Sequence, residues 1–190
     1  MILFVDETES KSLFIVAGLL VNSKQAVEQV FKRFKKKARS VSISDKYKSI
    51  LFNEFKSYIL DNQFQHLKIE MLSILNEIQY QVIYCCHIKS GEFKQKEKER
   101  SYINMLSSII SSTNNPVDVF FDSFGNQEFE NSIIKKLESF PNVRQAKSTV
   151  SETDHGIIIV DNLCSVIRLH EMHQDNEGFF TFITTNLKKV

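Results

Sequence analysis

The chain has 190 residues, 42% of them hydrophobic, so it is long enough to bury a full core as a single domain without disulfides or a structural metal. Its 24 basic and 23 acidic residues give a formal net charge of +1, which excludes a polycationic protein and leaves any nucleic-acid contact to local patches. Three cysteines, of which Cys85 and Cys86 are adjacent, form no metal-type C-x-x-C pair and are expected to be reduced core residues.

The first residues offer no segment for export or membrane insertion. The apolar run Ile2–Val5 ends at Asp6 and Glu7, which makes it much shorter than the apolar core of a signal peptide or a membrane span. We therefore expect a cytoplasmic protein without a membrane partner. Only 5 glycines and 2 prolines occur, which excludes a glycine-rich phosphate loop and disordered linkers.

Apolar spacing in the first half predicts a hairpin followed by helices. Ile2–Val5 and Ser12–Val21 have the branched, apolar composition of buried strands, and the polar stretch Glu7–Lys11 between them is expected to form the turn. Lys24–Ala38 has apolar residues at helical spacing and lysines on its opposite face. The other segments of this half are a loop, a helical or mixed stretch and a helix, expected over residues 41–47, 50–59 and 64–78.

The second half alternates strands with helices. The expected order is strand 81–88, helix 92–111, strand 117–121, helix 128–137, strand 143–148 and helix 155–172, the last capped by Thr153 or Asp154. The tail, residues 175–190, has no clear pattern. This order predicts an α/β fold in which a mixed sheet opens with an antiparallel hairpin and carries helices on both faces.

Two acidic residues close predicted strands. Asp6 follows the first strand and Asp122 follows the strand over 117–121, and strand ends are where side chains emerge beside a cleft. If the two strands are neighbours, both carboxylates lie at one edge of the sheet. Carboxylate and water oxygens are the ligands that Mg²⁺ and Mn²⁺ prefer.

Two further acids are surrounded by apolar residues. Asp161 lies four residues after Ile157 and three before Cys164, at the border of the apolar stripe of the last helix, where an unpaired charge is costly. Glu54 lies between Phe52 and Phe55. Together with Asp6 and Asp122, these acids could hold two ions roughly 4 Å apart, which would activate water and stabilise the leaving oxygen of a phosphodiester.

Each acid also has a purely structural interpretation. Asp6 could open the hairpin turn, Asp122 could cap the following helix, Asp161 could be a solvated helix residue, and Glu54 could lie on the surface. The four positions taken together favour the metal site.

Four short motifs, spread in order over nearly the whole chain, resemble the DUF3800 family: Phe4-Val5-Asp6-Glu7-Thr8, Glu54-Phe55-Lys56-Ser57, Phe120-Phe121-Asp122 and Ile159-Val160-Asp161. That family is similar to the ribonuclease H-like superfamily in its expected fold. The resemblance implies that Asp6, Glu54, Asp122 and Asp161 are the catalytic, metal-binding acids of a ribonuclease H-like nuclease, with Mg²⁺ or Mn²⁺ as cofactor and Glu7 as a substitute acid. It implies a nucleic-acid partner without distinguishing RNA from DNA.

The chain departs from the family pattern at two positions. Glu9 stands where the family usually has glycine, so we expect a differently shaped first turn. Val160 replaces the small residue before Asp161, which could alter how closely the last helix approaches the sheet.

Several basic residues are candidates for contact with a substrate. Lys56, beside Glu54, and Arg168, two helical turns after Asp161, could each bind a phosphate, although Arg168 could equally pair with Asp161. His155 is an auxiliary candidate for proton transfer, as Glu7 is for metal binding. The basic stretch 32–39 could neutralise phosphates or could be the solvated face of its helix.

Other classes of protein fit less well or remain open. In a PIN-like nuclease the first strand leads into a helix, whereas here a second strand, Leu13–Val21, follows. A haloacid-type phosphatase needs an aspartate two positions after Asp6, where this chain has Thr8. The open alternative is a catalytically inactive ribonuclease H-like interaction module of a mobile-element or defence system.

Overall fold

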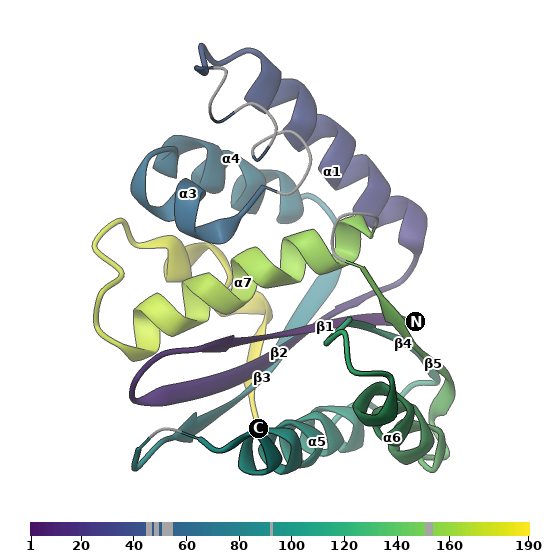
Figure 1. Ribbon diagram of the computed structural model, residues 1–190. Helices are drawn as coiled ribbons and strands as arrows, with labels where there is room; N and C mark the ends of the chain where they lie inside the picture. Colours follow the sequence, from purple (N-terminus) through teal and green to yellow (C-terminus); the bar gives the residue numbers. More distant parts are fainter. Residues whose placement is uncertain (45–46, 48–49, 51–54, 92, 151–153) are drawn as a thin grey trace.

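The computed structural model describes residues 1–44, 47, 50, 55–91, 93–150 and 154–190. The strands form one six-stranded sheet in the order β5-β4-β1-β2-β3-β6, with helices on both faces (Figure 1). The strands are β1 (Ile2–Glu9), β2 (Leu13–Val21), β3 (Tyr80–Ile88), β4 (Val117–Asp122), β5 (Val143–Thr149) and β6 (Leu187–Lys189). The α-helices are α1 (Lys24–Arg39), α3 (Ser57–Asn62), α4 (Gln65–Leu75), α5 (Gln95–Ser111), α6 (Gln127–Glu138) and α7 (His155–Glu171).

The sheet is mixed. Strands β1, β2 and β3 form an antiparallel meander, β4 and β5 run parallel to β1, and β6 runs parallel to β3. Strand β4 lies directly beside β1, with Phe4 opposite Phe120 and Val5 opposite Phe121. The predicted α/β class, with its opening hairpin and its helices on both faces, is confirmed, and the two strands that end in aspartate are neighbours.

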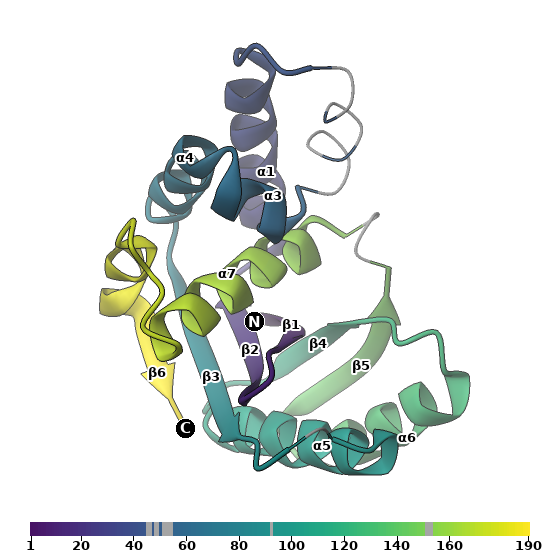
Figure 2. The same ribbon diagram turned by 60° about the vertical axis from the view of Figure 1, so that its left-hand side comes forward.

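The two faces of the sheet bury separate cores. Along β1, Phe4 points into the core formed with α1, α4 and α7, while Leu3 and Val5 point into the core formed with α5 and α6. Figure 2 shows α7 lying across one face and α5 and α6 covering the other. Because side chains alternate along a strand, Asp6 and Asp122 lie on the face that α7 covers.

Helix α7 approaches the sheet most closely at Gly156. A Cβ atom at this position would lie 2.3 Å from the ring of Phe4, so only glycine fits without displacing the ring. This close approach lies in the first turn of α7, before Val160, where the family pattern has a small residue. Most of α7 is buried, yet no helix in the described ranges is long and apolar enough to cross a membrane.

The first hairpin differs from its prediction. The expected turn over Glu7–Lys11 is wrong, because β1 continues to Glu9 and pairs with β2 over its whole length. The turn is tighter, with the amide of Ser10 donating to the carbonyl of Leu13 at 2.9 Å. Glu9, at the position where the family has glycine, pairs with Lys89 Nζ at 2.5 Å.

The remaining differences concern element ends and the tail. Asp154 caps α7 by accepting from the amide of Gly156 at 3.0 Å, while Thr153 and Glu54 lie outside the described residues. The tail forms two short 3-10 helices, Phe179–Phe182 and Thr184–Asn186, and then β6. Its single-turn elements are too short to produce a periodic signal in the sequence.

Candidate active site

A cavity of about 330 Å³ lies beside Asp6 and Glu7 of β1, the end of β4 and the first half of α7. We call it the acidic pocket, because four of its lining residues are acids. The lining is Asp6, Glu7, Lys56, Ser57, Tyr58, Asp122, Ile158 and Asp161. The structure therefore brings together three of the four predicted acids, from strands and a helix that are far apart in the chain. Of the predicted substrate-contacting residues, Lys56 also lines this acidic pocket.

Asp6 lies at the centre of the negative charge. It is 7% exposed, and its Oδ1 accepts a hydrogen bond from the amide of Glu7 at 2.8 Å. Burial raises the pKa of Asp6 well above its ordinary value, and the charges of Glu7, Asp161 and Asp122 raise this pKa further. Since β1 continues for three residues beyond Asp6, the interpretation of Asp6 as the opening of a hairpin turn is wrong.

Asp122 ends β4 on the same face of the sheet. Its Oδ1 accepts from the amide of Ser123 at 3.0 Å, and its charge contributes to the raised pKa of Asp6. The following helix, α6, is capped by Asn126, whose side chain accepts from the amide of Phe129 at 3.1 Å. Asp122 is therefore not the helix cap, and its carboxylate faces the acidic pocket.

Asp161 reaches the pocket from the middle of α7. Its Oδ1 accepts from the hydroxyl of Ser57 at 3.5 Å, which ties it to the first turn of α3. Burial raises the pKa of Asp161, while the backbone of Ser57 and the charges of Lys68 and Lys56 oppose that rise. Asp161 is therefore not a solvated helix residue.

Glu7 lines the pocket beside the three aspartates. Burial raises its pKa from 4.5 to about 7, the charge of Lys98, 3.8 Å away, opposes this rise, and Asp122 adds to it. Side chains alternate along β1, so Glu7 leaves the strand on the face opposite to Asp6 and yet lines the pocket. The family resemblance had implied only the role of a substitute acid for Glu7. The feature of the sequence that pointed to Glu7 is its place directly after Asp6.

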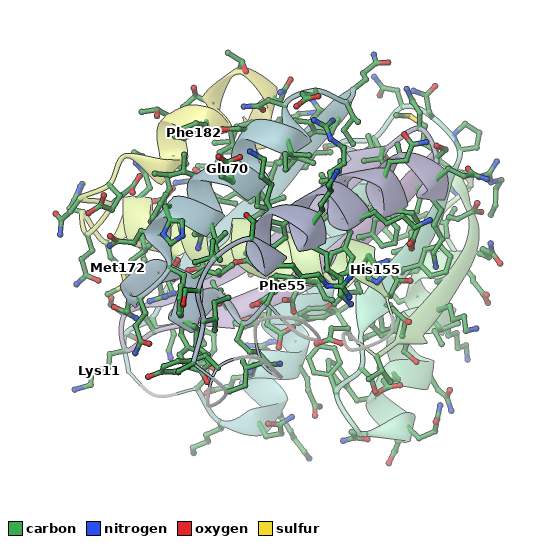
Figure 3. The ribbon with its side chains drawn as sticks, turned by 90° about the horizontal axis from the view of Figure 1, so that it is seen from above. Lys11, Phe55, Glu70, His155, Met172 and Phe182 are labelled. Atoms are coloured by element: carbon green, nitrogen blue, oxygen red, sulfur yellow. The ribbon has the colours of Figure 1, made fainter. Side chains whose placement is uncertain are left out.

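The predicted auxiliary residue His155 and the predicted substrate-contacting residue Arg168 both lie outside the pocket lining. His155 stacks on Phe31 of α1 with ring centroids 3.8 Å apart, and its Nδ1 lies 2.6 Å from Glu28, beside α1 in Figure 3. Arg168 lies further along α7, where its charge lowers the pKa of the buried Lys68. Ser57 and Lys98 were not singled out from the sequence, because neither residue type is diagnostic of a site.

The donor chemistry of the acidic pocket fits a hard divalent cation. Carboxylate oxygens are the preferred protein ligands of Mg²⁺ and Mn²⁺, and a dication would offset the mutual repulsion that raises the pKa of Asp6. Within the described ranges, no three side chains of His, Cys, Asp or Glu are placed to hold one ion as they stand. Metal binding would therefore require the carboxylates to draw together.

Comparisons with known proteins identify the fold. No protein-family model and no curated protein matches the chain, so the DUF3800 resemblance is not confirmed. The similar solved structures include ribonuclease HII in its PCNA complex from Archaeoglobus fulgidus, with a TM-score of 0.55, and ribonuclease H2 from Pyrococcus horikoshii OT3, with a TM-score of 0.54. Each is 12% identical to this chain, and each alignment covers 94% of this chain. The alignments cover 77% of the Archaeoglobus fulgidus chain and 76% of the Pyrococcus horikoshii chain. The chain therefore has a ribonuclease H-like fold.

Proposed function

We propose that the chain is a divalent-metal-dependent nuclease that hydrolyses phosphodiester bonds of nucleic acid. The observation that carries this proposal is the convergence of Asp6, Glu7, Asp122 and Asp161 on one pocket of a ribonuclease H-like sheet. We further propose that it is a single domain of the DUF3800 type and acts in the cytoplasm.

The acids would hold Mg²⁺ or Mn²⁺, and the bound ions would activate water and stabilise the leaving oxygen. Asp6 and Asp122 are held within the paired strands β1 and β4, and Asp161 by its hydrogen bond to Ser57, so the ligands start from rigid elements. Lys56 is the proposed phosphate contact in the pocket, because its charge faces Asp161. Arg168 and His155 are proposed only for an extended substrate path.

The fourth acid is either Glu7 or Glu54. Glu7 lines the pocket, whereas Glu54 lies outside the described residues, two positions before Lys56. Mutation distinguishes Glu7 from Glu54 as the fourth acid. If Glu7 is the ligand, Glu7→Gln lowers cleavage by at least about a hundredfold, as expected for loss of an interaction worth roughly 3 kcal/mol in the transition state, and Glu54→Gln does not.

A cleavage assay tests the proposal directly. Wild-type protein is incubated with single-stranded, duplex and hybrid nucleic acids in Mn²⁺ and, separately, in EDTA. We expect metal-dependent cleavage that disappears in Asp6→Asn and Asp122→Asn. The matched control is Asp118→Asn, because Asp118 lies four residues before Asp122 on β4 and pairs with Arg144 Nη2 at 2.5 Å, outside the pocket.

Two outcomes contradict the proposal. Wild-type protein that cleaves none of the substrates favours the inactive interaction module. Cleavage that survives in both Asp6→Asn and Asp122→Asn places the reaction elsewhere.

A further inference from the structure

A second pocket shares no lining residue with the acidic pocket, but an ion pair between Lys98 and Glu7 links the two. It has a volume of about 210 Å³ and lies between α5 and the loop that leads from β4 into α6. Its lining includes the aromatic residues Tyr102, Phe124 and Phe129. The polar residues that also line it are Gln95, Lys98, Glu99 and Asn126. We call it the aromatic pocket.

Contacts connect the aromatic pocket to the acids. Lys98 lines the aromatic pocket, and its Nζ lies 3.8 Å from Glu7, which lines the acidic pocket. Phe124 follows Asp122 by two residues. Burial raises the pKa of Tyr102, and the charges of Glu7, Asp6 and Asp122 raise this pKa further. A group in the aromatic pocket would therefore lie next to the acids.

The walls are held in place before any ligand binds. Buried Glu130 accepts hydrogen bonds from the hydroxyl of Ser123 at 2.7 Å and from the amides of Phe124 at 2.8 Å and Gly125 at 3.0 Å. Gly125 has φ +65°, a conformation that favours glycine, so the loop turns sharply here. These bonds fix Phe124 with its ring centroid 4.9 Å from that of Tyr102.

One polar atom at this pocket lacks a partner. Tyr102 is 1% exposed, and within the described residues its hydroxyl has no hydrogen-bond partner. A buried hydroxyl without a partner lowers stability, and buried hydroxyls are usually bonded. This hydroxyl is closed to solvent, so a ligand in the aromatic pocket would reach it with a polar edge only through a small shift of the Tyr102 ring.

We infer that the aromatic pocket binds one unpaired nucleobase of the nucleic acid next to the bond that is cut. This inference rests on the proposed function and specifies its substrate class. A base has a flat face that stacks on aromatic side chains and a polar edge that Tyr102, Lys98 or Asn126 can reach. A paired base cannot enter, because its edge and faces are occupied by the duplex. The substrate is therefore single-stranded or opened at this position.

Binding measured without cleavage tests the inference. Fluorescence anisotropy is recorded in Ca²⁺ for a single-stranded oligonucleotide, for its duplex, and for a strand in which the bases are replaced by abasic sites. The variants are Phe124→Ala, Tyr102→Phe and the control Phe140→Ala. Phe140 is a partly buried ring after α6 that does not line the aromatic pocket. Tyr102→Phe removes only the hydroxyl, so the core packing is retained.

We expect wild-type protein to bind the base-bearing strand about tenfold more tightly than the abasic strand, as stacking of one base predicts. Phe124→Ala should remove this difference by weakening only the base-bearing strand, Tyr102→Phe should reduce it, and Phe140→Ala should keep it. Equal affinity for both strands, tighter binding of the duplex, or no binding at all overturns the inference.

The outcome is separable from that of the proposed function. Asp6→Asn abolishes cleavage if the proposed function holds, yet it should leave the base-dependent difference in affinity intact. Cleavage without any base-dependent affinity would overturn the aromatic pocket alone. Base-dependent affinity in a wild-type protein that never cleaves would overturn the proposed nuclease alone.

Discussion

Two glutamates of β1, Glu7 and Glu9, have pKa values that their surroundings shift in opposite directions. Burial raises the pKa of Glu7 to about 7, whereas hydrogen bonding from Lys89 lowers the pKa of Glu9 below 4.5. The raised pKa means that the folded protein binds the proton of Glu7 more tightly than the unfolded chain does. The shifts of Asp6 and Asp161 have the same sign as that of Glu7.

The stability of the metal-free protein should therefore fall as pH rises. Below pH 4.5, Glu7 is protonated in both the folded and the unfolded protein, and its protonated form stabilises the fold. This stabilisation is lost as the pH rises from 4.5 through about 7. Glu7→Gln should raise the free energy of unfolding by about 1–3 kcal/mol at pH 8 relative to wild type, and by much less at pH 4. Urea denaturation in EDTA at the two pH values measures the difference.

Glu9→Gln is the matched control, two residues away on the same strand. Its lowered pKa gives a stabilising effect that is present above the unfolded pKa and lost at acid pH, so this substitution should destabilise the protein at pH 8. A stability change of the same sign in both variants at pH 8 contradicts the assignment.

At the scale of elements, α3 is attached to α7 by two contacts one helical turn apart. Ser57 donates to Asp161, and four residues later along both helices Asp61 accepts from Ser165. Asp61 also pairs with Lys68 of α4, whose side chain is fully buried. The buried pair thus fixes the helix that presents Lys56 and Ser57 to the acidic pocket.

Breaking this buried pair from one side should be strongly destabilising. Asp61→Ala leaves the charge of Lys68 without its carboxylate, and we expect a loss of about 3–5 kcal/mol in the free energy of unfolding. Adding Lys68→Met to Asp61→Ala should recover part of that loss, because no buried charge then remains. Chemical denaturation measures both.

The exposed pair on β4 supplies the comparison. Asp118→Ala removes the partner of Arg144, which is about half exposed, and should change stability by less than about 1 kcal/mol. An Asp61→Ala variant as stable as Asp118→Ala would show that the buried pair does not hold α3 in place.

Strand ends were predictable from the sequence, but partners across the fold were not. Asp6 and Asp122 could be placed because each ends a short apolar run, and their adjacency required only that the two strands be neighbours. The end of β1 was misplaced because its last residues are polar yet still pair with β2. The apolar composition of a segment predicts whether its side chains are buried, but it does not predict where backbone pairing between strands ends.

Residues that act through distant contacts gave no local signal. Lys68 lies on the apolar side of α4 and looks like a helix surface lysine until Asp61 is placed beside it. Tyr102 fits the apolar stripe of α5 as an ordinary core residue, and only the folded protein shows its hydroxyl without a partner among the described residues. The surroundings in the folded protein determine both roles, and no short motif marks them. Asp61 and Lys68 are only 7 residues apart, yet they lie on different helices.

For the molecule as a whole, the topology concentrates negative charge at one end of the sheet. Parallel pairing of β1 with β4 and the crossing of α7 bring together carboxylates from positions 6, 122 and 161, although the chain as a whole is nearly neutral. Burial, and then this repulsion, raise the pKa of Asp6, so folding with all of these acids ionised is unfavourable. A dication that binds only the folded state should therefore stabilise the whole protein.

Thermal unfolding with and without Mn²⁺ is the measurement that tests this most directly, carried out on wild type, Asp122→Asn and Asp118→Asn. At about a hundredfold excess over the dissociation constant, Mn²⁺ adds about 2.7 kcal/mol, which corresponds to a rise of roughly 5–10 °C for a chain of this size. We predict this rise in wild type and Asp118→Asn and its loss in Asp122→Asn. No rise in wild type at millimolar Mn²⁺, or an equal rise in all three proteins, contradicts a metal site formed by these acids.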